Sequence, residues 1–142
     1  MRHSRFLVVG APMMAAALAC HSAAGPARTV SVGLIDPGGG LAQMSLVVPE
    51  TATVAVPTPV QASTWGDACS QADTTDLQVA GLLADITLYD RNPSSGACAR
   101  DLQGIARALT ITFSVPGEAT VRLHGRSLTD TTTVSATLTV RP

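Results

Sequence analysis

His124 is the residue best suited to acid-base chemistry in this chain of 142 residues. It lies two residues from both Arg122 and Arg126 in a segment typical of a β-strand, so the three side chains are expected to share one face. A catalytic histidine also needs an orienting carboxylate and a nucleophile within reach. Asp85, Asp101 and several serines could serve, but no spacing selects them. We therefore expect a solvated strand face and no catalytic residues.

The face that carries Arg122, His124 and Arg126 could instead meet an anion such as a phosphate, a glycan carboxylate or an acidic partner. Trp65 and Tyr89 could form a sugar-stacking pair. Nucleic acid is not expected as a ligand, because the chain after residue 19 has seven arginines against ten acidic residues, a net charge of about −3. An aromatic platform for stacking bases is also missing from the sequence.

Lysine is absent from the sequence, and all nine basic residues are arginine. This excludes the phosphate-binding loop with its lysine, the lysine Schiff base and the Ser-x-x-Lys nucleophile. No cofactor is expected.

Three cysteines leave one unpaired in an oxidising compartment. If Cys20 has a separate use, Cys69 and Cys98 form a natural disulfide pair, and two free buried thiols are the alternative. Because the pair would consume these sulfurs, and zinc needs three or four ligands, no metal site is expected there.

Asp67, Asp73 and Asp76 form an oxygen-rich cluster that we expect to lie in one loop. Their spacing is not that of a calcium-binding loop, which alternates its ligands and closes with a bidentate Glu. We interpret these residues as turn and capping residues beside the disulfide.

Residues 1–19 have the layout of a secretory signal peptide, with a short basic start and an uncharged run of 14 residues. Cys20 follows directly, as in a bacterial lipobox, although Ala17 and Leu18 depart from the preferred order of a leucine and then a small residue. We predict lipidation of Cys20 and a short tether over residues 20–28. The alternative is a secreted or periplasmic soluble protein with an unpaired thiol.

The remaining residues, 29–142, show period-2 alternation in segments rich in Val and Thr. The clearest segments end the chain, and we expect them to form three consecutive antiparallel strands with a Pro-Gly turn between the first two. These segments cover residues 109–115, 118–126 and 133–140. The apolar side of the middle segment holds Ala119, Val121, Leu123 and Gly125.

The earlier segments are less regular. Strands are expected over residues 30–35, 46–48 and 51–56, with a hairpin over 77–88 that turns near Gly81. Residues 36–40 and 90–96 are expected to be loops, and residues 101–106 could form a helical turn. About seven short strands predict one all-β domain, an immunoglobulin-like antiparallel β-sandwich, with a closed barrel as the alternative.

The order of several motifs resembles small bacterial envelope lipoproteins with an immunoglobulin-like domain. These motifs are Val48-Pro49-Glu50-Thr51, Trp65-Gly66-Asp67-Ala68-Cys69, Tyr89-Asp90 and the run from Phe113 to Arg126. Trp65 precedes both Cys69 and Cys98, so the Cys-Trp-Cys order of antibody domains is absent. The resemblance implies a non-enzymatic structural or binding module at the cell envelope, anchored by its lipid, with an envelope protein or a glycan as partner. A small envelope hydrolase that uses His124 is the alternative.

Overall fold

The computed structural model describes residues 28–36, 45–93, 98–99 and 101–142. The predicted signal peptide, Cys20 with the tether as far as residue 27, and residues 37–40 of the predicted glycine-rich loop lie outside the described residues.

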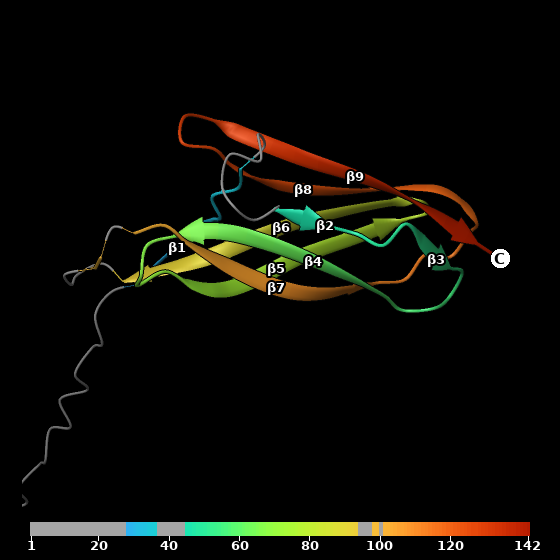
Figure 1. Cartoon of the computed structure of the whole chain (residues 1–142), viewed down its shortest axis with the longest axis horizontal. Helices are drawn as coiled ribbons and strands as arrows, with labels where there is room; N and C mark the ends of the chain where they lie inside the picture. The colour runs from blue at the N-terminus through green and yellow to red at the C-terminus, as the bar shows by residue number, and fades with distance from the viewer. Residues whose placement is uncertain (1–27, 37–44, 94–97, 100) are drawn as a thin grey trace, which may run out of the picture.

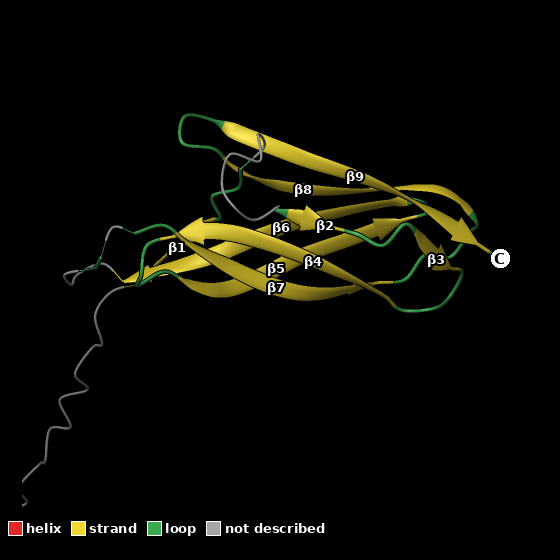
Figure 2. Cartoon of the chain, in the orientation of Figure 1, coloured by secondary structure: helices red, strands yellow, loops and turns green. Residues whose placement is uncertain are grey.

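The described chain is all-β, with nine strands and no helix (Figure 2). They are β1 (Arg28–Val32), β2 (Leu46–Val47), β3 (Thr51–Thr53), β4 (Thr58–Gly66), β5 (Gln71–Ala80), β6 (Leu83–Pro93), β7 (Gln103–Ile111), β8 (Gly117–Arg126) and β9 (Thr131–Arg141). The all-β prediction is therefore confirmed.

The strands form two sheets with the apolar core between them (Figure 1). The first sheet has the order β1-β6-β8-β9-β3, and β5 also pairs with β6; the second has the order β2-β4-β7. Leu34 joins the two sheets, because it bridges to Trp65 of β4 and to Arg126 of β8. The main sheet therefore curls into a half-barrel rather than the closed barrel considered as an alternative.

The core follows the predicted alternation. Ala119, Val121 and Leu123 of β8 are fully buried, as are Ile86 and Leu88 of β6. Both sheets contribute to the same hydrophobic cluster, so each sheet hides the apolar face of the other.

The expected antiparallel arrangement is wrong in two places. β6 pairs parallel to β8, and β3 pairs parallel to β9. The prediction of three consecutive antiparallel strands at the end of the chain is also wrong. β7 pairs with β4 in the second sheet, and of the three strands only β8 and β9 pair with each other. Because the chain leaves the first sheet for β7 and then returns, β8 runs in the direction of β6.

β4 is a strand that the sequence analysis did not predict, and it contains Pro59. β2 pairs only with Gln61 and Ala62 of β4, so it does not extend as far as Pro59. On that side of β4, no described strand needs a hydrogen bond from the N–H group that Pro59 lacks.

Two loop predictions and one possible helical turn are also not found. The segment expected to be an exposed loop after residue 90 continues β6 to Pro93, and residues 94–96 lie outside the described residues. The ambiguous segment 101–106 contains the start of β7 rather than a helical turn, because it pairs with β4. The acidic segment after Cys69 becomes β5 from Gln71 onward. The hairpin turn at Gly81 is confirmed, with φ of 61°, a conformation that favours glycine.

Candidate functional site

His124 lies in a row of polar side chains on the outer face of the first sheet. Three neighbouring strands contribute to the row: Asp85 comes from β6, Arg122 and His124 from β8, and Thr133 from β9. Asp85 is the register partner of Arg122, and Thr133 is that of His124. Because alternate β8 residues are buried in the core, the pleat directs these polar residues outward.

These four side chains form one hydrogen-bonded cluster. Arg122 donates to Asp85 through Nε at 2.7 Å and Nη2 at 2.9 Å, and His124 Nε2 lies 2.7 Å from the same carboxylate. His124 Nδ1 lies 3.0 Å from Thr133 Oγ1. The side chains of Asp85, His124 and Arg122 are 31% to 39% exposed, so water reaches the cluster.

The cluster fixes the ionisation of its carboxylate. The hydrogen bonds from Arg122 and then from His124 lower the pKa of Asp85 from 3.8 to about 2. The hydrogen bond to Asp85 in turn raises the pKa of Arg122. The Asp85 carboxylate therefore stays ionised well below neutral pH, where it is paired with Arg122 and lies within hydrogen-bond distance of His124 Nε2.

Replacing Asp85 with asparagine tests this ion pair through the pH dependence of stability. The pKa of Asp85 is lower in the folded state, so its stabilisation is present above 3.8 and is lost as the pH falls towards about 2. Asp85→Asn should lower the free energy of unfolding by about 0.2–1 kcal/mol near neutral pH, the range for exposed pairs. Urea denaturation of both proteins should show this difference shrinking on acidification. An unchanged difference at low pH would contradict the assignment.

A broad, open hollow lies beside the cluster. Its volume is about 580 Å³, and its lining includes His124, Thr87 and the three threonines at 131–133. Hydroxyl and imidazole groups can both donate and accept hydrogen bonds, so this surface suits a polar partner.

The other predicted surface residues lie apart from the cluster. Arg126 follows on the same strand, and its Nε donates to Val32 O at 3.0 Å. Tyr89 belongs to β6, and its register partner is Val32 of β1. Trp65 belongs to β4 in the second sheet and lines a separate cleft that Arg126 shares. Tyr89 lines neither of the two hollows described here.

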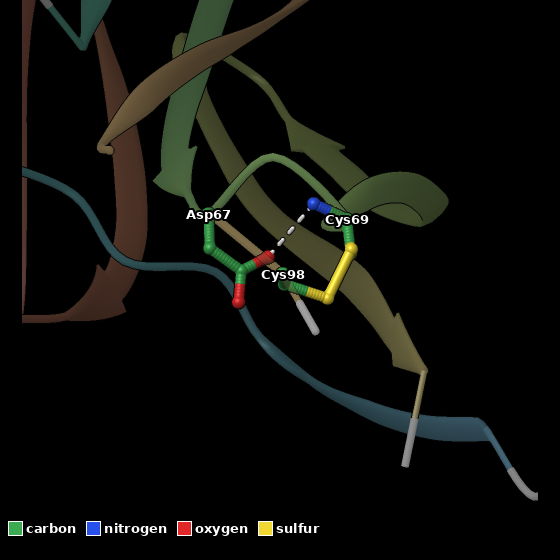
Figure 3. Close-up of side chains that lie close together, drawn as sticks. All are labelled: Asp67, Cys69 and Cys98. Carbon is green, nitrogen blue, oxygen red and sulfur yellow. Dashed lines mark hydrogen bonds between the residues drawn. A yellow bond between two sulfur atoms is a disulfide. The ribbon is translucent and has the colours of Figure 1, made fainter. Parts of the chain in front are cut away.

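The predicted disulfide between Cys69 and Cys98 is present, with Cα atoms 5.7 Å apart (Figure 3). Asp67 Oδ1 accepts a hydrogen bond from Cys69 N at 3.0 Å and lies 2.9 Å from Ser70 Oγ. These bonds lower the pKa of Asp67 and close the turn before the disulfide. Asp67 and the two sulfurs lie close together, but disulfide sulfurs are not metal ligands.

The expectation that Asp73 and Asp76 share one loop with Asp67 is wrong, because both lie in β5. They extend along an exposed strand instead of gathering around the Asp67 turn.

Comparisons with protein-family models, curated proteins and solved structures give no match. The functional argument therefore rests on the residues of this chain. Within the described ranges, no helix is long and apolar enough to cross a membrane.

The structure also reveals a buried polar cluster that the sequence analysis missed. Arg107 Nη2 donates to Asp90 Oδ1 at 2.6 Å and to Tyr89 O at 2.7 Å, and Thr64 Oγ1 donates to the same Asp90 oxygen at 3.0 Å. The side chains of Arg107 and Asp90 are only 8% and 5% exposed. One signal was available in the sequence. Arg107 lies two residues from both Ile105 and Leu109, so it shares their inward face of β7.

Proposed function

We propose that the mature protein is a non-enzymatic binding module, exported from the cytoplasm and attached to the bacterial envelope through a lipid on Cys20. Support for export comes from the signal-like residues 1–19 and from the Cys69–Cys98 disulfide, which persists in oxidising compartments. With those two cysteines paired, Cys20 is the remaining thiol, and lipidation gives it a use. A secreted or periplasmic soluble form is the alternative.

We propose further that the domain is a variant of the immunoglobulin-like sandwich. Two facing sheets of alternating strands around one core support this. The parallel pairs β6–β8 and β3–β9 depart from the antiparallel pattern of that family.

The observation that carries the binding function is the Asp85–Arg122–His124–Thr133 cluster on the open sheet face. The hydrogen bonds within the cluster hold these exposed side chains in one arrangement before a partner arrives, which lowers the entropy lost on binding. The adjoining threonines extend the hydrogen-bonding surface. An envelope protein or a glycan with polar groups fits this face.

A second candidate function, hydrolysis, is favoured by one specific feature. Asp85, His124 and the Thr133 hydroxyl form a carboxylate-imidazole-hydroxyl chain, the order found in hydrolytic triads. Asp85 is also bound by Arg122, however, and the cluster lies on an open face where water competes for the same groups. Ester hydrolysis by the parent protein that disappears in Thr133→Ala would favour this candidate over the binding module.

Photo-crosslinking in intact cells tests the binding function. A photoreactive residue at Thr131, on the open face, should give a discrete adduct with an envelope component. The matched control replaces Thr110, an exposed residue of β7 in the other sheet, and should give none. Arg122→Ala should weaken the adduct at position 131. Adducts of equal intensity at both positions, or at neither, would contradict the proposal.

A further inference from the structure

A second, smaller cleft lies at the end of the sandwich beside the disulfide turn. Its volume is about 260 Å³. Trp65 comes from β4, Asp90 and Asn92 from the end of β6, and Arg126 from the end of β8. Asp67 and Leu128 belong to the turns beside these strand ends. Segments far apart in the sequence thus converge on one small space.

The wall of this cleft is polar and balanced in charge. Asp90 is buried and is neutralised by Arg107 behind it. Asp67 keeps its negative charge, because its hydrogen bonds lower its pKa, and Arg126 supplies a positive charge in the same cleft. A ligand with a strong net charge of either sign therefore gains little here.

One residue of this wall carries a buried polar group without a hydrogen-bond partner. Among the described residues, the buried side-chain nitrogens without a hydrogen-bond partner are Trp65 Nε1 and the Nε and Nη1 atoms of Arg107. Trp65 lines the cleft, whereas Arg107 is bonded to the cleft residue Asp90 and is not itself part of the wall. Buried donors without acceptors are costly and rare, so the unpaired Trp65 indole N–H at this cleft calls for an acceptor.

Size limits the ligand further. The cleft volume of about 260 Å³ lies below the range of roughly 300–1,000 Å³ for pockets that enclose drug-sized molecules. One ring fits and a long chain does not. Leu102 and Leu128, which also line the cleft, are 51% and 87% exposed and give it an apolar rim.

We infer that this cleft binds a single neutral sugar ring, either free or at the end of a glycan. Sugar hydroxyls donate to the Asp67 and Asp90 carboxylates and accept from Trp65 Nε1 and Arg126, while the C–H face of the ring packs on Leu128. This inference rests on the proposed binding function and names a ligand class for a second surface of the same module.

Titration of the isotope-labelled full-length protein by NMR tests the inference. The probes are neutral monosaccharides, with glycine and glutamate as a second panel. We expect saturable millimolar binding of at least one sugar, with the shift changes concentrated at the Trp65 indole N–H and the Asn92 side-chain amide. Trp65→Phe keeps an aromatic side chain but removes the N–H donor, and it should weaken binding about tenfold, or 1.4 kcal/mol.

Two variants keep the outcome interpretable. Leu128→Ala alters a side chain that is 87% exposed, so it should leave the fold intact and still weaken sugar binding. Thr133→Ala on the open face should leave sugar binding unchanged. Three results would overturn the inference: no sugar binds, only the amino acids bind, or the shifts map to His124. If crosslinking at Thr131 succeeds while every sugar fails, the sugar inference is wrong and the proposed binding function stands.

Discussion

Asp90→Ala is expected to lower the free energy of unfolding by about 3–5 kcal/mol, because it leaves the Arg107 guanidinium buried without its counter-ion. The carboxylate also accepts the hydroxyl of Thr64, which is fully buried and would lose its partner. The backbone of Gly33 also packs closely against this carboxylate, since a Cβ at that position would lie 2.8 Å from Asp90 Oδ2. Urea denaturation measures the loss as a lower midpoint with an unchanged slope.

The matched control for Asp90→Ala removes both charges at once. Asp90→Leu combined with Arg107→Met replaces the ion pair with apolar side chains of similar size and should recover most of the lost stability. The single variant therefore reports the cost of an unpaired buried charge. A loss below about 1 kcal/mol in Asp90→Ala would mean that water reaches Arg107 and that the pair is not buried in solution.

Removing the disulfide is expected to cost about 3–4 kcal/mol. Cys69 and Cys98 are 29 residues apart, and in the chain-entropy model the crosslink stabilises by restricting a loop of this length in the unfolded chain. The variant Cys69→Ala with Cys98→Ala should therefore unfold at a lower urea concentration.

Reduction of the parent protein is the control for this effect. It should lower the midpoint by a similar amount, whereas the double variant should not respond to reductant. A parent protein whose midpoint is unaffected by reductant would contradict a structural role for the disulfide.

The sequence allowed the core faces and the disulfide to be predicted, because both depend on local or simple rules. In β6 and β8, alternate apolar residues were enough to identify the buried side. The cysteine pairing followed from the count of three, once Cys20 was assigned elsewhere.

Strand partners could not be predicted in the same way. The turn after Phe113 suggested a hairpin, yet the chain changes sheets there, and alternation alone does not distinguish a return to the same sheet from a crossover. β4 was missed because the effect of Pro59 depends on whether a neighbouring strand needs its N–H group, which is a tertiary property.

The candidate site was predicted in part. The shared face of Arg122, His124 and Arg126 followed from period-2 spacing, and Asp85 was among the carboxylates considered for His124. The choice between Asp85 and Asp101 required the parallel pairing of β6 with β8. The end cleft joins residues from distant turns and strand ends, so no local pattern could predict it.

Mass spectrometry of the protein purified from its native cells tests the central claim, an exported and lipid-anchored module, most directly. We expect a mature chain that begins at Cys20 with the added mass of a lipid, and a peptide in which Cys69 is linked to Cys98. A Cys20→Ser variant should lose the lipid mass and keep the disulfide. A native chain that retains residues 1–19, or that carries three alkylatable thiols without reductant, would contradict the account.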